Sequence, residues 1–558
     1  MLLPRMKATP RKQLSLTAFG GYRHDHLAGA DQFFDMQNLS SDRFPLLGTR
    51  KPRGLCATLQ HPNGLCAKNA LCYVDGTTLY YDGTAVGAVS NTPKQFVTLG
   101  SSILIWPDKL RYDTAQGALT PLGASFKSTG SVTFSMCNLQ GEVYSGYTVA
   151  AMPPDNPDGG DLWLDTQDMP HTLKRYSAAT GLWISVSATY IRIGCTGIGA
   201  RFSDYDGVRI SGCTSAALNT SALLYAVSAN YVLIAGTLDA AFSQTTPLTI
   251  AREIPDFDYL CEKDNRVWGC SNARREIACC KLGDPTNWAC YMGISTDSYA
   301  VSVGSGGDFT ACCAYNGNVL FFKEDRLLKL LGTKPENFQL NAALCYGVQQ
   351  GSHQSLATAG GLLFYQSGCG VCAYGGALPE LAGAPLGGRF RNAVGGGWDD
   401  KYYVSMQDDA GGWHLFAYDT RYGIWHREDD AHALAFAPLS GDLYMLLANG
   451  KLLSLSGSGT AEDTLSWKAE TGELIDSAHA RPQKLILRLE MALGASLCVQ
   501  LSYDGDDFLD AAYVSVTRKR PVVLPLRLRR CDSLRLRLSG TGEATLHALT
   551  LQLEEGSV

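Results

Sequence analysis

The sequence predicts an all-β protein built around a β-propeller. Three observations lead to this prediction: a composition rich in turn formers, a repeated strand-turn-strand unit, and an almost complete lack of helical periodicity. Of the 558 residues, 59 are glycine and 26 are tyrosine, whereas charged residues make up only 18%. Such a composition is typical of strands joined by tight turns.

Short apolar runs separated by Gly, Asn or Asp predict hairpins from residue 55 onward. Residues 70–74 turn through Asp75 and Gly76, and residues 311–315 turn through Asn316 and Gly317. These turn residues tolerate the positive φ angles of two-residue hairpin loops. Similar units recur at residues 265–270, 360–365, 400–405 and 441–446. Four-stranded units repeated roughly every 40 to 50 residues are typical of propeller blades.

A second repeat supports the blade interpretation. Residues 111–117 are closely matched by residues 417–423 and more loosely by residues 175–181, and Trp425 and Trp183 follow the glycine of the last two copies. A tyrosine, a polar turn and an aromatic on the next strand are expected to close the outer hairpin of a blade. The alternative is chance similarity between tyrosine-rich turns, above all for the third copy.

The blade rhythm is interrupted once. Between about residues 125 and 254 it stops, beginning with a proline-rich loop at residues 153–160, and we expect one or two small inserted β domains there. Residues 55–124 are then the first propeller blades, and residues 255–459 the remaining ones.

The two ends of the chain differ from the middle. Residues 1–54 hold few strand signals and predict an extended N-terminal arm, which wraps its own propeller or reaches a neighbouring subunit. In residues 460–558, leucines alternate with charged residues at 484–490 and 533–538. Strict alternation is typical of half-buried antiparallel strands, so a C-terminal β-sandwich is expected.

Charge and cysteine content narrow the function classes. The net charge of -6 gives no general attraction for nucleic acid phosphates or acidic membranes, and no apolar run approaches the length of a membrane helix. The 18 cysteines are scattered and no secretion signal precedes them, which predicts free thiols made in a reducing cytoplasm. The CxxC at Cys369 and Cys372 lacks a second ligand pair, so neither a metal nor a cofactor is expected.

No catalytic constellation is evident, and the sequence therefore predicts that the chain is not an enzyme. A nucleophile elbow, a Walker phosphate loop and a zincin helix are all missing. Paired carboxylates occur at Asp399-Asp400, Asp408-Asp409 and Asp429-Asp430. Adjacent strand residues point to opposite faces, so these pairs are better placed on exposed turns than around a scissile bond. No catalytic residue is predicted.

A basic cluster near the end is the candidate interface. Its members are Arg518, Lys519, Arg520, Arg527, Arg529 and Arg530, and Arg535 and Arg537 share one strand face nearby. Most such runs are solvated faces. The functional alternative is docking onto an acidic partner protein or nearby DNA, and of these two we favour the protein.

Several stretches resemble tail structural proteins of bacteriophages and prophages of gut Firmicutes. In the N-terminal part they are residues 19–21, 35–39, 45–47 and 50–54, which we call the signature segments. Residues 264–270, 282–288 and 319–325 look like the same group, as do residues 529–532, 540–542 and 555–557. The match covers nearly the whole chain. More distantly, the layout is similar to the tail hub or nozzle proteins of short-tailed phages, also called packaged-DNA stabilisation proteins.

The resemblance implies a virion protein of the phage tail, assembled in the host bacterial cytoplasm. It implies a ring homo-oligomer, commonly a hexamer, below the portal and adaptor proteins, in contact with tail fibre, spike or needle proteins. Such a ring retains the packaged genome, touches DNA transiently in its channel and conducts it on ejection. A modest negative charge suits a lumen through which DNA slides.

Two other functions are considered. A carbohydrate-binding tail-tip or fibre protein would use Trp163, Tyr176 and Trp183 of the insertion as an aromatic glycan platform. A propeller glycosidase is ranked last, because the carboxylate pairs do not converge in the sequence pattern.

Overall fold

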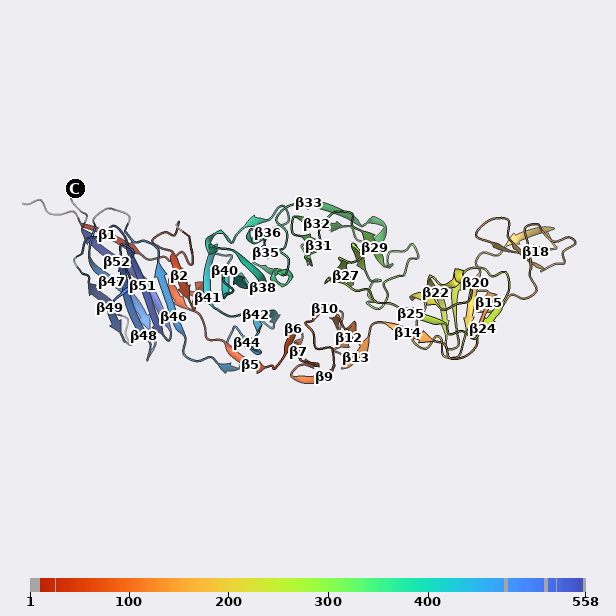
Figure 1. Ribbon diagram of the computed structural model, residues 1–558, viewed down its shortest axis with the longest axis horizontal. Coiled ribbons are helices and arrows are strands. Elements are labelled where there is room, and N and C mark those ends of the chain that lie inside the picture. Colours follow the sequence, from red (N-terminus) through yellow and green to blue (C-terminus); the bar gives the residue numbers. More distant parts are fainter. Residues whose placement is uncertain (1–10, 26, 476–479, 516–519, 528, 555–558) are drawn as a thin grey trace, which may run out of the picture.

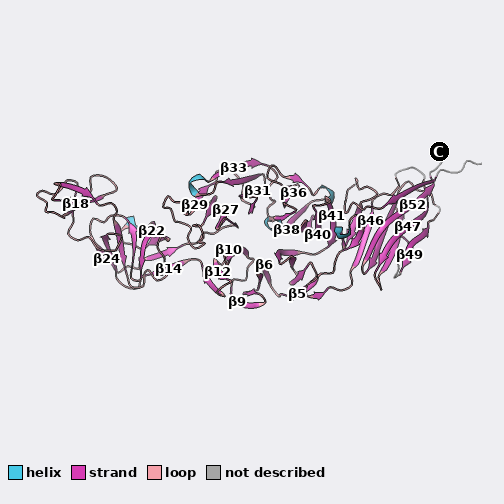
Figure 2. Ribbon diagram, turned by 180° about the vertical axis from the view of Figure 1, so that it is seen from behind, coloured by secondary structure: helices cyan, strands magenta, loops and turns pink. Residues whose placement is uncertain are grey.

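The chain is an elongated, nearly all-β molecule in which the sandwich, the propeller and the insertion follow one another along the long axis (Figures 1 and 2). The structure, a computed structural model, describes residues 11–25, 27–475, 480–515, 520–527 and 529–554. The fold class expected from the sequence is confirmed. Helical structure in this described part is limited to five single turns: η1 (Ser41–Arg43), η2 (Ala216–Leu218), η3 (Pro335–Asn337), η4 (His353–Ser355) and η5 (Ala384–Leu386).

The described residues form seven propeller blades, of which two precede the insertion and five follow it. Blade 1 consists of β6 (Pro62–Lys68), β7 (Ala70–Asp75), β8 (Thr78–Tyr81) and β9 (Thr84–Ala88). Blade 2 consists of β10 (Gln95–Leu99), β11 (Ser102–Trp106), β12 (Leu110–Asp113) and β13 (Ala118–Pro121). Blade 3 consists of β26 (Tyr259–Lys263), β27 (Arg266–Ser271), β28 (Glu276–Cys279) and β29 (Tyr299–Ser302). Blade 4 consists of β30 (Ala311–Tyr315), β31 (Asn318–Lys323), β32 (Arg326–Leu331) and β33 (Gln339–Leu344).

The last three blades complete the ring. Blade 5 consists of β34 (Ala357–Ala359), β35 (Leu362–Ser367), β36 (Gly370–Tyr374) and β37 (Glu380–Leu381). Blade 6 consists of β38 (Phe390–Trp398), β39 (Lys401–Asp408), β40 (Trp413–Asp419) and β41 (Ile424–Asp429). Blade 7 consists of β42 (Ala433–Leu439), β43 (Asp442–Leu447), β44 (Lys451–Ser454), β5 (Gly54–Thr58) and the short β45 (Thr460–Ala461). Every strand pair within these blades is antiparallel, as hairpin connections require.

Blade 7 closes the ring because it combines strands from far apart in the sequence. Strand β5, from the N-terminal part, pairs with β44, so that Leu452 lies opposite Ala57. Leu65 of blade 1 and Leu446 and Leu452 of blade 7 then share one buried cluster. Ring closure therefore depends on an apolar seam as well as on strand pairing.

The insertion joins the propeller through two neighbouring strands. An eight-stranded sheet has the order β14 (Ala124–Lys127), β25 (Thr249–Arg252), β21 (Gly207–Ser211), β22 (Ser221–Ser228), β23 (Tyr231–Ala235), β20 (Tyr190–Gly194), β15 (Val132–Cys137), β24 (Phe242–Gln244). A smaller sheet of β16 (Thr148–Ala150), β17 (Leu162–Asp165), β18 (Thr172–Ser177) and β19 (Leu182–Ser185) lies at the far end of the molecule (Figure 1). Strands β14 and β25 pair, so the insertion leaves and re-enters the propeller at one place.

The sandwich is built from both ends of the chain. One sheet has the order β3 (Leu39–Ser40), β4 (Leu47–Thr49), β52 (Ala544–Glu554), β47 (Arg481–Met491), β50 (Arg520–Pro525), with β1 (Arg11–Leu16) also pairing with β52. The other has the order β2 (Phe33–Gln37), β46 (Ser466–Thr471), β51 (Leu534–Thr541), β48 (Ser496–Tyr503), β49 (Leu509–Val514). The N-terminal segment is thus extended, and its four strands are paired within the sandwich.

The predicted leucine alternation forms the sandwich core. Leu485 and Leu487 of β47 face Leu536 and Leu538 of β51 across the interior, and all four side chains are at most 2% exposed. The charged residues between them point outward, as a period of two requires.

The repeated motif forms one kind of turn in two settings. In blades 2 and 6 it closes the outer hairpin, where Gly117 and Gly423 donate to the carbonyls of Asp113 and Asp419 at 2.8 and 2.9 Å. The third copy makes the same turn between β18 and β19, in the small sheet of the insertion. The motif therefore specifies a hairpin and does not mark a blade by itself.

Candidate functional site

The joint between propeller and sandwich contains a buried ionic network. We use the name joint for the residues Asn38, Arg50, Arg53, Glu428, Asp429 and Glu462. Arg53 donates to Glu428 and to Asp429, both at 2.6 Å. Arg50 forms two parallel hydrogen bonds with Glu462 at 2.8 and 3.0 Å, and its Nε donates to the Asn38 side chain. Both guanidinium side chains are about as buried as the apolar core.

Backbone contacts strengthen the joint. The N–H of Tyr22 donates to the carbonyl of Trp425 at 2.6 Å, and the N–H of Asn38 donates to that of Glu428 at 2.5 Å. Both acceptors lie on β41, the outer strand of blade 6. Gly21 has a φ of 77°, and a Cβ there would lie 2.5 Å from the Trp425 carbonyl oxygen. This close approach requires glycine.

The joint lowers the pKa of two of its carboxylates, Asp429 and Glu462. Burial alone would raise the pKa of Asp429, but Arg53 and Arg50 hold it below the ordinary value. The pKa of Glu462 is also lowered, because hydrogen bonds from Arg50 and from the Arg53 backbone outweigh burial. Paired, hydrogen-bonded charges of this kind depend on accurate geometry. The joint therefore favours one fixed arrangement of the two domains.

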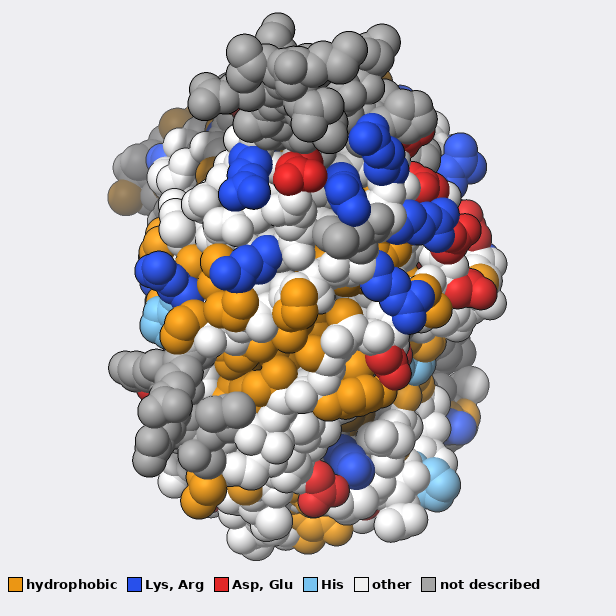
Figure 3. Space-filling view, turned by 90° about the vertical axis from the view of Figure 1, so that its left-hand side faces the viewer, with side chains coloured by type: hydrophobic (Ala, Val, Ile, Leu, Met, Phe, Trp, Pro, Cys, Tyr) orange, Lys and Arg blue, Asp and Glu red, His pale blue; other side chains and the backbone are white. Residues whose placement is uncertain are grey.

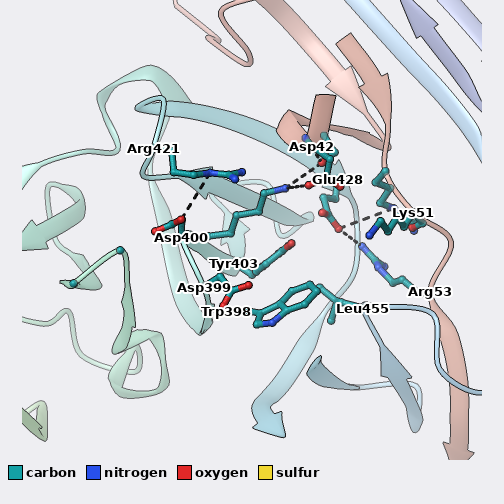
Figure 4. Close-up of a pocket in the computed structure, with 15 residues that line it drawn as sticks. Asp42, Lys51, Arg53, Trp398, Asp399, Asp400, Tyr403, Arg421, Glu428 and Leu455 are labelled. Carbon is teal, nitrogen blue, oxygen red and sulfur yellow. Dashed lines mark hydrogen bonds and ion pairs between the residues drawn. The ribbon is translucent and has the colours of Figure 1, made fainter. Parts of the chain in front are cut away.

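A polar cleft of about 600 Å³ lies beside the joint (Figure 4). Its wall combines residues 40–53, which include the last signature segment, with the β34–β35 turn, blade 6 and Leu455 after β44. The lining residues are Ser40, Asp42, Arg50, Lys51, Arg53, Gly360, Gly361, Trp398, Asp399, Asp400, Lys401, Tyr403, Arg421, Glu428 and Leu455. Figure 4 shows Trp398, Asp399 and Tyr403 close together, with Arg53 and Lys51 across the cleft.

The central channel of the propeller is a second cavity, of about 940 Å³. The innermost strands of the blades line it. Its most polar members are Lys94, Glu262, His353 and His432, and the His432 ring stacks on Trp413 with centroids 3.5 Å apart. Glu262 is the one carboxylate among the channel-lining residues that the structure describes. The channel therefore does not present a carboxylate pair of the kind glycoside hydrolysis uses.

The predicted basic cluster is only partly described. Arg518 and Lys519 lie outside the described residues, and Arg520 is placed in β50 by its backbone. Arg527 and Arg530 are exposed, whereas Arg529 pairs with Asp506 at 2.7 Å and packs over the Tyr503 ring. Figure 3 shows hydrophobic side chains gathered on the sandwich end, with Lys and Arg around them.

Two neighbours of this cluster are neutralised within the chain. Arg535 and Arg537 both contact the carboxylate of Glu470. Their guanidinium groups also lie over the Phe508 ring. These two arginines are therefore less available to a partner than the strand pattern indicates.

The predicted aromatic platform does form a cluster, but it is not flat and exposed. Trp163 is 4% exposed, donates its indole N–H to the Ala150 carbonyl and packs edge-on against Trp183. Tyr176 and Trp183 are half-buried. Trp163 is therefore a core residue of the small sheet, and only the other two can contact a ligand.

The structure bears on the predictions for the cysteines, for metal binding and for membrane helices. All 18 cysteines are free thiols, and burial raises the pKa of Cys279 and of Cys280 to about 12. Cys372 is buried in β36, and its thiol contacts the Ser367 hydroxyl. In the described ranges no cluster of three His, Cys, Asp or Glu could hold a metal ion. No helix there is long and apolar enough to span a membrane.

The carboxylate pairs divide between turns and the joint. Asp399 and Asp400 lie on the β38–β39 turn, as expected. The expectation of an exposed turn is wrong for Asp429, because it ends β41 and is held by Arg53. The sequence reasoning missed Trp398, although it directly precedes the Asp399-Asp400 pair.

Comparisons with known proteins bear on the fold. No family model and no curated protein sequence matches the chain. Among solved structures, the WD40 repeats of RRP9 match with 9% identity and a TM-score of 0.29, covering 75% of this chain and 99% of that one. An exo-beta-1,3-galactanase from Phanerochaete chrysosporium matches with 8% identity and a TM-score of 0.22 (52% and 94%). The endosialidase of phage phi92 matches with 10% identity and a TM-score of 0.17 (78% and 59%).

These comparisons correct one expectation. The prediction that the chain is not an enzyme is wrong as an exclusion: the solved structures that match include glycoside hydrolases and an endosialidase, at TM-scores of 0.22 or less. The lack of Walker, zincin and nucleophile-elbow motifs does not exclude glycoside hydrolysis, which needs only two carboxyl groups flanking the scissile bond. At these identities and TM-scores the matches assign no activity to this chain.

Proposed function

We propose that this protein is a structural component of a tailed-phage virion, forming a ring-shaped tail hub or nozzle below the portal and adaptor. One observation carries the proposal: residues of the signature segments, which carry the resemblance to phage tail proteins, build the joint. Asn38, Arg50 and Arg53 all make joint contacts, and Gly21 leaves room for the close approach to the Trp425 carbonyl. A ring that retains packaged DNA requires subunits whose domains keep a fixed arrangement, and a buried ionic joint supplies that.

The test is an image of the virion with this protein labelled. We expect a symmetric ring at the tail, in contact with portal or adaptor proteins on one side and with fibre, spike or needle proteins on the other. A stable isolated monomer with no place in the particle contradicts the proposal. The copy number, expected to be six, follows from the same image.

A carbohydrate-binding tail-tip or fibre protein is the second candidate. Its support is the half-buried pair Tyr176 and Trp183 at the far end of the insertion, whose rings are tilted by 57° with centroids 5.3 Å apart. Binding of the purified chain to host cells, reduced by Trp183→Ala, supports this function. A chain that occupies the tail ring and does not bind host cells favours the hub.

A further inference from the structure

We propose that the cleft beside the joint binds a neutral oligosaccharide. This site is separate from the aromatic cluster of the insertion and goes beyond the virion role proposed above. Three properties of the cleft support this proposal: its charge balance, its indole wall and its volume.

Most charges in the cleft are already paired. Lys401 contacts Asp42 at 2.5 Å, Arg421 contacts Asp419 at 2.7 Å, and Arg53 is held by Glu428 and Asp429. Lys401 accordingly holds the pKa of Asp42 below its ordinary value, against the effect of burial. These groups are not free to attract a charged ligand.

Two charged groups of the lining have no close partner. In the described part of the chain, neither the Lys51 ammonium nor the Asp399 carboxylate forms a hydrogen bond or close ion pair, and both side chains are exposed. They are opposite in sign, and Asp400 lies 3.9 Å from Arg421, which it shares with Asp419, so the cleft offers a ligand no excess of cations. A phosphate or sulfated ligand, which requires an excess of cations, is not favoured. A ligand with many neutral hydroxyl groups fits better.

The indole of Trp398 supplies an apolar wall. It packs against the blade 7 cluster that contains Leu443, Met445 and Leu455, which fixes its orientation, and the side chain remains half-exposed. Figure 4 places it beside Asp399 and opposite Arg53. A sugar ring presents C–H groups on its faces and hydroxyls at its rim. An indole face flanked by a carboxylate and cationic donors is complementary to both.

The size of the cleft also fits a small-molecule ligand. The cleft volume of about 600 Å³ lies in the range, roughly 300 to 1,000 Å³, of pockets that bind small molecules.

The experiment titrates the purified full-length chain with maltotriose, cellotriose, chitotriose and a beta-1,3-linked galactotriose, followed by saturation-transfer NMR and calorimetry. A hyaluronan tetrasaccharide serves as the anionic probe. We expect at least one neutral oligosaccharide to bind, and the anionic one to bind at least tenfold more weakly.

Three variants locate the site. Trp398→Ala is expected to weaken binding at least tenfold, and Asp399→Asn about threefold to fivefold. Asn suits the Asp399 turn, where φ is 50°, so this second variant tests the site even if Trp398→Ala does not fold. The matched control is Trp183→Ala in the insertion, which is expected to leave affinity within twofold.

Each contrary result overturns the proposal: no binding of any neutral oligosaccharide, preference for the anionic probe, or full affinity in both cleft variants. Binding lost in Trp183→Ala and kept in Trp398→Ala places the carbohydrate site in the insertion instead. None of these results bears on the tail ring, which is tested by imaging the virion.

Discussion

The propeller is attached to its two neighbours in different ways. On the sandwich side, buried Arg50 and Arg53 contact three carboxylates. On the insertion side, the direct hydrogen bonds come from a neutral amide: Asn287 donates to the Tyr205 carbonyl at 2.7 Å and accepts from the Gly207 N–H at 3.2 Å. The charged groups there are fewer: Lys281 lies over the Tyr205 ring, and Arg252 pairs with Asp206. A charged network tolerates little change, whereas neutral amide contacts can be lost at modest cost. We therefore expect the sandwich and propeller to behave as one unit, and the insertion as a separable one.

The largest expected effect comes from breaking the joint. Arg53→Ala removes the closest cation from Glu428 and Asp429 and leaves them only Arg50, at 4.0 and 3.7 Å; loss of a buried partner of this kind typically costs about 3 to 5 kcal/mol. Denaturant unfolding, followed by domain-resolved hydrogen exchange, should show the propeller and sandwich destabilised together. The control is Arg274→Ala, whose side chain is 46% exposed and 3.8 Å from Glu276, and it should change stability by less than about 0.5 kcal/mol. Equal effects of the two substitutions would disprove the difference between the two attachments.

A smaller effect is expected from pH. Burial, reinforced by repulsion from Lys401, lowers the pKa of His426 on β41 to about 3. The unfolded chain binds a proton near pH 6.5 that the folded chain does not, so stability is full above pH 6.5 and falls below it. The free energy of unfolding falls by about 1.4 kcal/mol per pH unit below pH 6.5, or by roughly 2 kcal/mol between pH 6.5 and pH 5.

The pH effect is measured as unfolding midpoints across that range. In His426→Gln, the pH dependence of the propeller's unfolding free energy should correspond to about one proton fewer than in the unsubstituted chain, whatever the effect on absolute stability. The insertion should keep its hydrogen-exchange protection over the same range. An unchanged slope in the variant means that another group is responsible.

The smallest expected effect lies at the insertion. Asn287 is 1% exposed, and Asn287→Ala removes both of its contacts with Tyr205 and Gly207, at a cost of about 1 to 2 kcal/mol. Hydrogen exchange around residues 203–207 and 281–290 should speed up while the joint stays protected. Asn449→Ala, an exposed turn residue, is the control and should leave exchange in both regions unchanged. Loss of protection at the joint in Asn287→Ala would show that the attachments are coupled.

The fold could be predicted from the sequence because its signals are local. The Asp75-Gly76 and Asn316-Gly317 turns lie between adjacent strands, and the leucine alternation of β47 lies within one strand. Such patterns depend on backbone geometry and the period of two, which neighbouring residues determine.

The joint and the cleft could not be predicted, because they depend on contacts across the chain. Arg53 and Glu428 are 375 residues apart, and nothing near either residue indicates the other. In the sequence, Trp398 looks like any aromatic residue of a strand. Only the fold brings Lys51 and Arg53 to the same cleft. The resemblance to phage proteins singled out the signature segments without indicating that they connect two domains.

Strand β1 pairs with β52 in the sandwich, with Arg11 opposite Glu554. During synthesis at about 5 to 20 residues per second, β1 therefore waits roughly 30 to 110 s for this partner. The paired strands of the insertion, β14 and β25, are complete much earlier. The insertion can fold while the chain is still being made, whereas the sandwich cannot be completed until β52 has been made. Half-made chains thus present the insertion in finished form before the sandwich can form, which gives the order in which these two surfaces become available during assembly.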